Sequence, residues 1–584
     1  YNYFGSNAQN NIWFTTAYFM INFIMVIFIS IAFLTIISTR INSLIKIYFS
    51  NPKKIHIFTN INDKSLALAK DIAKDDKNSL IIFISEVLKA KDASTSTNKS
   101  LIKEGFAIVY LDNGKTFFEK IGLPARYNKI PANIYIFSNN DAENLQYATC
   151  DLIEFQNNKL VNIYVELADA NLLQNNISSN MTILSTGELS AMALDFKMPL
   201  YKTISPNEIV DGCVNKTLRL AIVGFGHTGE AVFKELYCGG QTKNLNIETV
   251  IFDQNMDSKI GLFYDKYPYL KASSKIEVVN CNSFDETFFS YINSTVFDYF
   301  AISMGDDAVS TKLANQINQN YTRKNVNTII AVKIRNKTNE LLLSSSSTMV
   351  TVHSFGNYND IYNVDNIIHE RFYDIAKVYN YAYSKIYDDL FNECKQKFDT
   401  TNSLIEYKSS YEYKSASYNS LINEIKNMDT HILTDCAEKE WHKTPLTNRK
   451  SSLANAEHFL HKLYLVQAEN NTDALVKLQN NSALRNNLAI TEHQRWNEYF
   501  IANGWSPMDY KKLLSNEQFA SEPNCDKHKW RKNEKSMQHA CIASWSNLQE
   551  INEIFKQNYY IYDYLTIDIL EILLSKNIIN CSML

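Results

Sequence analysis

The feature that most constrains this chain is a long apolar stretch near its start. Residues 1–39 carry no charged side chain, and Ile12–Ile37 is almost wholly apolar. As a helix rising about 1.5 Å per residue, this stretch would reach roughly 39 Å, enough to cross the hydrocarbon core of a bilayer with some tilt. Trp13 and Tyr18 lie where an interfacial aromatic belt would be, and basic residues follow at Arg40, Lys46, Lys53 and Lys54. The sequence therefore predicts one transmembrane helix in the inner (plasma) membrane, with the remainder of the chain in the cytoplasm.

Other interpretations of this region are weaker. A signal peptide has a basic start and an apolar core of about 7–15 residues, and the sequence shows neither. A buried core helix this long and free of charge is uncommon. Asn2–Ser6 faintly resembles the aromatic-glycine end of a cation-channel filter, but a polar extracellular loop is favoured. Because the sequence opens on Tyr1 and not on Met, we expect residues upstream, with room for another apolar segment.

The composition is that of a multidomain globular protein. A chain of 584 residues is expected to form roughly three or four domains. Apolar residues make up 45% and charged residues 21%, which is not the composition of a disordered chain. The net charge of −4 argues against a nucleic-acid partner. Nine cysteines without C-x-x-C pairs indicate reduced thiols rather than disulfides or a metal site.

After the basic residues, short apolar runs alternate with helical stretches. The strand Ile55–Phe58 is followed by a helix, and further strands are expected at 80–86, 106–112, 134–140 and 162–167. This alternation predicts a parallel sheet with right-handed crossovers. The first strand–helix turn has no glycine, so Asn60, Asn62 and Ser65 are expected to cap the helix rather than to bind phosphate.

The unit then repeats with a glycine-rich turn. Leu218–Val223 is a predicted strand, and Gly224–Gly229 opens a helix with the spacing G-x-G-x-x-G. The first glycine permits a tight turn, the second lets the backbone approach a pyrophosphate, and the third lets the helix pack on the strand. The next strand ends at Asp253, where an acid can bind ribose hydroxyls.

The segments GFGHTGEA, VIFD, ISMGDD and IAVKIR resemble the TrkA-N, or RCK, domains that regulate potassium channels and transporters. FTNINDKSLALA and IYIFSNNDAENLQYA repeat the pattern more loosely, so the resemblance covers about residues 53–355. It implies two tandem doubly wound Rossmann-like α/β domains, at 41–205 and 206–360, that assemble into homo-oligomers (dimer or tetramer). It also implies a regulatory site for NAD or another adenine nucleotide, at Gly224, Gly226, His227, Gly229, Asp253 and Asp306. A Rossmann domain that has lost its ligand is the alternative.

The C-terminal third carries a second set of motifs. Residues 361–440 are expected to form a helical connector. Beyond it, 441–463 contains W…R-x-S…A-x-H…K-L, 488–505 contains E-H-x-R-W…G-W, and 539–548 contains H-x-C-I-x-x-W. These motifs resemble the RyR domain, the repeat first described in ryanodine receptors, and imply a mainly α domain at 441–584. The stretch 513–535 departs from the pattern and leaves the alignment of Trp530 open.

The chemistry of these motifs suits an anionic, ring-bearing ligand. Indole rings stack on a base, and guanidinium groups pair with phosphate. The candidate ligand residues are Arg449, Ser452, Lys462, Glu492, His493, Arg495, Trp496, Trp505 and Trp545. The alternative is that the tryptophans belong to the core and the polar residues form a satisfied internal network. His493 is disfavoured as a metal ligand because no second ligand follows at i+3 or i+4.

Together these features favour a membrane-anchored sensor of a small nucleotide or second messenger. We expect a ligand-gated oligomeric ion channel or channel-like effector, with anti-phage defence as a hypothesis by analogy. One alternative is a membrane-bound NAD-using enzyme, for which only His227 and Asp253 offer acid–base chemistry beside the glycine turn. The other is a non-conducting regulatory scaffold of an ion transporter.

Overall fold

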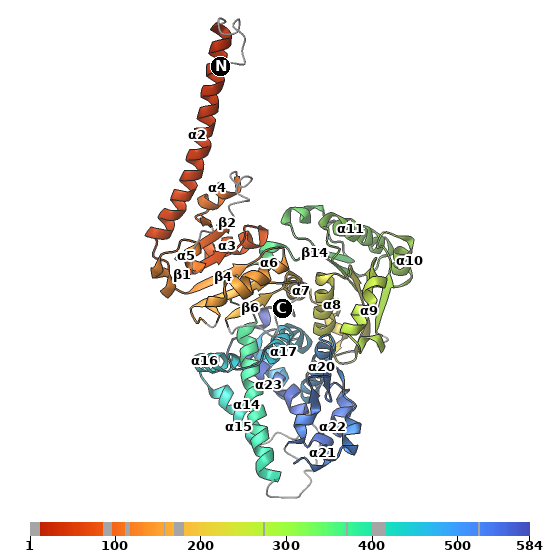
Figure 1. Ribbon diagram of the computed structural model, residues 1–584. Helices are drawn as coiled ribbons and strands as arrows, with labels where there is room; N and C mark the ends of the chain where they lie inside the picture. Colours follow the sequence, from red (N-terminus) through yellow and green to blue (C-terminus); the bar gives the residue numbers. More distant parts are fainter. Residues whose placement is uncertain are drawn as a thin grey trace. The chain divides into compact units, whose positions relative to one another are not determined.

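The structure is a computed structural model of the whole chain (Figure 1). It describes residues 12–85, 96–110, 117–156, 158–168, 180–272, 275–369, 372–398, 416–523 and 526–583. The chain divides into two compact units. The first unit contains Tyr1–Ser185 and Tyr362–Val364, and the second contains Thr186–Ile361 and Asp365–Leu584.

The first unit begins with α2 (Ile12–Phe49), a single helix of 38 residues (Figure 1). The predicted membrane span lies on this helix, but residues 1–11, and the side chains of 12–14 and 31–41, lie outside the described residues. Within the described part of the chain, no helix combines the length and apolar character that a membrane crossing requires.

The first unit continues as a six-stranded parallel sheet. Its strand order is β3-β2-β1-β4-β5-β6, in which the chain starts in the middle, builds one edge and then returns to build the other. The strands are β1 (Lys54–Phe58), β2 (Ser79–Ser85), β3 (Ala107–Tyr110), β4 (Ala132–Ile136), β5 (Val161–Glu166) and β6 (Met181–Leu184). The helices are α3 (Asp63–Asp75), α4 (Ser96–Lys103), α5 (Phe117–Lys120), α6 (Asp141–Gln146) and the 3₁₀ turn η2 (Ala125–Lys129).

Runs of branched apolar residues explain the central strands. Ile55 and Ile57 of β1, Ile134 of β4 and Ile163 of β5 are fully buried in one core. Such continuous apolar strands are typical of parallel sheets, which are covered on both faces. The helix α3 begins after Asn62, whose side chain accepts a hydrogen bond from the Ser65 N–H, so the predicted capping role of Asn62 is confirmed.

The second unit repeats this topology. Its sheet has the order β11-β10-β9-β12-β13-β14, again all parallel. The strands are β9 (Lys216–Val223), β10 (Leu245–Asp253), β11 (Ile276–Asn280), β12 (Tyr299–Ile302), β13 (Thr328–Lys333) and β14 (Val350–Phe355). The helices are α7 (Thr186–Lys197), α8 (His227–Gly239), α9 (Met256–Lys266), α10 (Glu286–Ser294) and α11 (Asp307–Lys324). The prediction of two tandem parallel-sheet α/β domains is confirmed.

A mainly helical region completes the second unit, as predicted. Its larger helices are α14 (Tyr373–Phe398), α15 (Ala416–Asn427), α16 (Thr430–Trp441), α17 (Leu446–Glu457), α18 (Phe459–Val466), α19 (Asn471–Asn480), α20 (Ser482–Ile501), α22 (Leu548–Phe555) and α23 (Tyr560–Ser575). Three short strands, β15 (Ser506–Pro507), β16 (Lys532–Asn533) and β17 (Gln538–His539), form a small sheet. Leu218 and Ile222 of β9 share one apolar core with Leu488 of α20 and Leu565 of α23, so the sheet and the helices fold as one body.

Candidate functional site

The turn between β9 and α8 has the geometry that its three glycines predict. Gly224 has φ +88°, and a Cβ there would lie 2.7 Å from the Ser303 carbonyl oxygen. At Gly229 a Cβ would lie 1.9 Å from the Gly224 carbonyl oxygen, because the helix packs directly on the turn. Gly226 is exposed, and no described atom beyond its chain neighbours lies within 4 Å of its Cβ position. The fold therefore needs the first and third glycines, whereas the second leaves open space at the start of α8.

This open space lies at the positively polarised end of a helix. Gly226 is the N-cap of α8, so no side chain caps the helix, and its first N–H groups have no partners within the helix. Lys333, at the end of β13, donates a hydrogen bond from Nζ to Thr228 Oγ1 in the first turn of α8. His227 is exposed beside it. A helix N-terminus and an ammonium group together favour an anion.

Asp253 holds the glycine turn from the end of β10. Its carboxylate accepts hydrogen bonds from the N–H groups of Phe225 and Asn255, both at 2.8 Å, and from Lys259 Nζ at 3.0 Å. Partial burial alone would raise the pKa of Asp253, but these donors outweigh it and hold the pKa below its usual value. Asp253 is thus an ionised carboxylate next to the open space, and a ribose hydroxyl would have to compete with Lys259 for it.

The turn after β12 lies at the same edge of the sheet, because β9, β12 and β13 are neighbouring strands. Asp306 is the N-cap of α11 and accepts a hydrogen bond from the Val309 N–H at 2.9 Å. Arg335 donates to the Gly305 carbonyl oxygen from the segment after β13. Lys333 and Arg335 were not predicted as site residues, although they belong to the segment IAVKIR; their position at the carboxyl end of a parallel strand was the available signal.

The corresponding crevice of the first sheet is filled by its own side chains. Asn62 caps α3 and also donates to the Phe137 carbonyl oxygen, so its side chain takes the place that Gly226 leaves open. Asn60 Nδ2 donates to Glu143 Oε1 at 3.2 Å, and Ser138 Oγ donates to the other oxygen of Glu143. These contacts join the turn after β1 to the turn after β4, which is where a ligand would enter a fold of this type.

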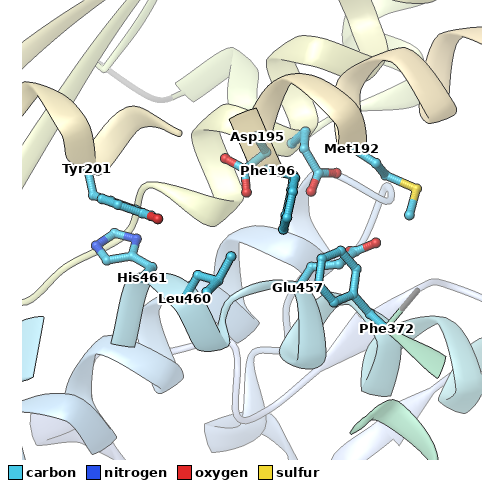
Figure 2. Close-up of a pocket in the computed structure, with 9 residues that line it drawn as sticks. Met192, Asp195, Phe196, Tyr201, Phe372, Glu457, Leu460 and His461 are labelled. Atoms are coloured by element: carbon cyan, nitrogen blue, oxygen red, sulfur yellow. The ribbon is translucent and has the colours of Figure 1, made fainter. Parts of the chain in front are cut away.

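Three carboxyl groups line a small pocket within the second unit. Asp195 of α7, Glu235 of α8 and Glu457 of α17 lie around it, and Figure 2 shows Asp195 and Glu457 approaching from facing helices. The space has room for about one water molecule. Burial raises the pKa of Asp195 to about 7, and burial together with the charge of Asp195 raises the pKa of Glu457 to about 8. Across the described residues no group of His, Cys, Asp and Glu is arranged to hold a metal ion.

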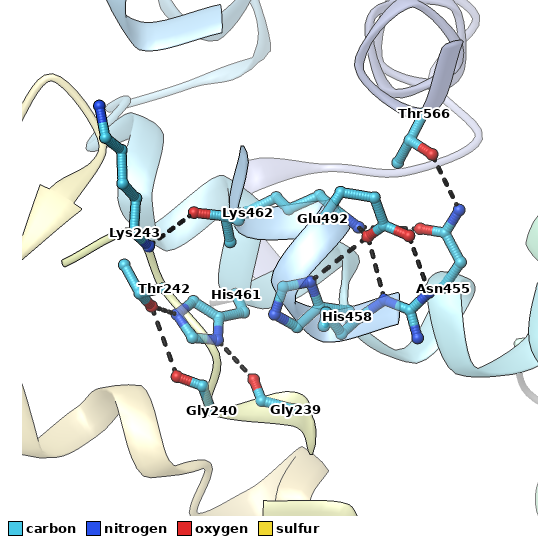
Figure 3. Close-up of polar contacts among 12 residues, drawn as sticks. Gly239, Gly240, Thr242, Lys243, Asn455, His458, His461, Lys462, Glu492 and Thr566 are labelled. Carbon is cyan, nitrogen blue, oxygen red and sulfur yellow. Dashed lines mark hydrogen bonds and ion pairs between the residues drawn. The ribbon is translucent and has the colours of Figure 1, made fainter. Parts of the chain in front are cut away.

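The polar residues of the predicted RyR motif form a buried ion network (Figure 3). Arg495 donates to both oxygens of Glu492, at 2.7 and 3.0 Å, and Lys462 Nζ donates to Glu492 at 2.8 Å and to Asn455 at 2.8 Å. The side chains of Glu492, Arg495 and Lys462 are at most 2% exposed. Burial lowers the pKa of Lys462 to about 8, and Glu492 partly opposes this shift. This is the internal network that sequence analysis weighed against a ligand site.

The other candidate residues of this region also contact protein groups. His493 contacts Asp563 at 3.2 Å through Nδ1 and the Ala543 carbonyl oxygen at 2.9 Å through Nε2. Arg449 lies apart from the network, where Nε donates to the Thr444 carbonyl oxygen at 2.8 Å. Ser452 is buried on α17.

The three candidate tryptophans pack against other aromatic rings. The ring centroids of Trp496 and Phe500 are 4.4 Å apart, those of Trp505 and Phe500 5.5 Å, and those of Trp545 and Tyr560 4.6 Å. These indoles meet the chain's own rings in tilted or edge-to-face arrangements rather than in parallel stacks.

No protein-family model and no curated protein matches the chain. Solved structures similar to it include the GsuK channel, which is 13% identical with a TM-score of 0.34 over 54% of this chain and 68% of that one. GsuK bound to ADP is 14% identical, with a TM-score of 0.33 over 63% of this chain and 86% of that one. Anabaena Alr3699/HepE in complex with UDP and glucose is 10% identical, with a TM-score of 0.18 over 55% and 89%. At these scores the likeness carries no inference about the function of this chain.

Proposed function

We propose that the second α/β domain binds an adenine nucleotide or NAD at the start of α8, and that the chain is a membrane-anchored sensor. The observation that carries this proposal is the open space at Gly226, between two glycines that the fold itself requires. An uncapped helix N-terminus next to a glycine that lacks a side chain is the arrangement that a phosphate needs.

The neighbouring side chains suit the rest of such a ligand. The N–H groups of α8 and the ammonium group of Lys333 would hold the phosphates, since both are positive and face the same turn. Asp253 would accept hydrogen bonds from ribose hydroxyls once Lys259 moves away. His227 and Asp306 lie at the same edge of the sheet, the latter as the cap of α11.

The membrane part of the proposal is supported by the surface of α2. Phe19, Phe23 and Phe28 are 57%, 67% and 68% exposed, and the apolar residues between them are exposed as well. Exposed apolar side chains around a helix are costly in water, at about 25 cal/mol per Å² of apolar area, and favourable in a hydrocarbon core. We propose that α2 crosses the inner (plasma) membrane, with both α/β domains in the cytoplasm.

A single helix per chain can line a pore only within an oligomer, so the proposal includes a homo-oligomeric ligand-gated channel or channel-like effector. The helical region, proposed as an RyR domain from its motifs, contains a buried ion network. A binding role for Glu492, Arg495 and Lys462 would first require this network to open.

Nucleotide binding is tested by thermal unfolding of the full chain in detergent with ADP, ATP and NAD. A bound nucleotide at about 100 times its Kd would stabilise the second unit by about 2.7 kcal/mol. Gly226→Leu should keep the fold and abolish this shift, because its side chain fills the open space. Gly261→Leu is the matched control, since Gly261 is also exposed and has no neighbour within 4 Å. Equal shifts in both variants, or no shift in the unaltered chain, would refute the site.

Conduction is tested separately. The full chain reconstituted in liposomes should show ion flux that depends on the nucleotide identified by the binding experiment. Nucleotide binding without ion flux under any of the three nucleotides would refute the channel hypothesis and leave a non-conducting sensor. Turnover of NAD would favour the alternative of a membrane-bound NAD-using enzyme.

A further inference from the structure

The C-terminal end of α2 is fastened to the first α/β unit by two consecutive residues of η2. Arg126 Nη2 lies 2.6 Å from the Tyr48 carbonyl oxygen, 3.1 Å from that of Ser50 and 3.2 Å from that of Ile47. Tyr127 is fully buried, and its hydroxyl donates to the Ile47 carbonyl oxygen. Both side chains therefore bind backbone carbonyl groups at the end of α2.

These contacts satisfy a general requirement of helix ends. The last four carbonyl groups of a helix have no partners within the helix, and they carry the negative end of its dipole. A guanidinium group is well suited to this place because it is always charged and presents several N–H donors in one plane. Arg126 thus caps α2 from a separate element, 79 residues along the chain from Ile47.

A second attachment lies one turn before Ile47, on the same side of α2. Ser43 is 3% exposed, and its hydroxyl accepts a hydrogen bond from the Ile108 N–H at 3.0 Å. Ile108 lies in β3, the edge strand of the first sheet. An edge strand presents backbone groups without a partner strand, and α2 supplies one of the missing partners. Ile47, one turn after Ser43, is fully buried in the core of the same unit.

The connection from α2 to the sheet is short. Only residues 50–53 separate the last residue of α2 from the first residue of β1. Within this connection the Ser50 N–H donates to the Lys46 carbonyl oxygen at 3.1 Å, and the Lys53 N–H donates to the Asn78 carbonyl oxygen at 3.1 Å. The segment that follows the apolar stretch is therefore held at both of its ends.

We propose that the last turns of α2 and the first α/β unit move as one rigid body, with Arg126 as the positioning residue that locks them together. A displacement of this unit is then passed directly to the helix, without loss in a flexible linker. The inference rests on the proposed function only where it makes α2 a membrane helix; the mechanical connection stands on the contacts themselves.

The experiment is hydrogen–deuterium exchange on the full chain in detergent, without nucleotide. Arg126→Ala should make the amides of residues 47–50 exchange at least about fivefold faster, since a charged hydrogen-bond donor to the helix end is lost. In Arg126→Lys these amides should exchange at a rate between those of the unaltered chain and Arg126→Ala, because lysine keeps the charge but not the planar group. Lys129→Ala is the matched control, as it removes an exposed cation from the same 3₁₀ turn and should leave these amides unchanged.

Ser43→Ala provides an independent variant and should speed exchange at the Ile108 amide alone. Exchange of residues 47–50 in Arg126→Ala equal to that in Lys129→Ala would overturn the proposal, as would an unchanged Ile108 amide in Ser43→Ala. If Arg126→Ala does not fold, the exchange rates in Arg126→Lys and Ser43→Ala test the proposal in its place. None of these readouts depends on nucleotide binding or ion flux, so failure here is distinct from failure of the proposed function.

Discussion

Glu492→Gln is the substitution that most directly tests the buried ion network of the second unit. In the structure one carboxylate balances two cations, with Arg495 on both of its oxygens and Lys462 at 2.8 Å. Glutamine keeps the size of the side chain and removes its charge. Two cations that are at most 2% exposed would then face a neutral amide. Lys462, whose pKa is already lowered to about 8, can give up its proton, but Arg495 cannot.

The expected loss is about 3–5 kcal/mol of unfolding free energy, the usual cost of breaking a buried ion pair by removing one partner. Urea denaturation of the full chain in detergent, followed by tryptophan fluorescence, measures it without changing the ionic strength. Five tryptophans, at 441, 496, 505, 530 and 545, lie in the second unit and one, at 13, in the first, so the signal reports mainly on the second unit.

Two further variants make the test specific. Asp473→Asn breaks an exposed pair with Lys477 and should leave the transition unchanged, because exposed pairs contribute little. Adding Lys462→Met to Glu492→Gln should recover part of the loss, since one unpaired cation is removed; we expect a coupling of at least about 1 kcal/mol. A loss below about 1 kcal/mol for Glu492→Gln, or strictly additive effects in the double variant, would refute the network as a stabilising element.

Two other predictions concern protonation and helix capping. Asp195 and Glu457 should each contribute a loss of stability as pH rises from about 4 to about 8, because their folded-state pKa values are about 7 and 8, above their ordinary values of 3.8 and 4.5. Their contribution is fully present below the ordinary pKa, and Asp195→Asn should flatten the pH profile of urea midpoints; a profile unchanged by this variant would contradict the assignment. Asn62→Ala should cost about 1 kcal/mol through loss of the α3 cap, seen as faster exchange of the amides in the first turn of α3, and equal exchange would show that the cap contributes nothing.

The alternation of strands and helices could be predicted because it depends on local patterns. The apolar runs at Ile55–Phe58 and Leu218–Val223 became the central strands of their sheets. Gly224 and Gly229 could be assigned roles because the constraint on each is set within a few residues: a positive φ at one and a helix packed on its own turn at the other. Such constraints are visible in a single sequence.

Whether the charged residues bind a ligand or pair with one another could not be predicted in the same way. Glu492, His493 and Arg495 share one helix, and that was visible in the sequence, but whether they face a ligand or each other depends on Lys462, which comes from another helix. The same holds for the acidic pocket, where Glu235 and Glu457 lie far apart in the chain. Burial converts identical residue types from ligand groups into structural ones, and burial is decided by tertiary packing.

The two α/β domains have the same topology, but side chains fill the crevice of the first, whereas a glycine leaves space in the crevice of the second. In the first domain Asn60, Asn62 and Glu143 fill the turn region, so its crevice is closed by its own hydrogen bonds, while Arg126 holds the end of α2. In the second domain Gly226 leaves that position open. Among the described residues of the first domain, the Asn62 side chain occupies the position that corresponds to Gly226. On the proposed function, nucleotide sensing therefore belongs to the second repeat and the attachment of α2 to the first.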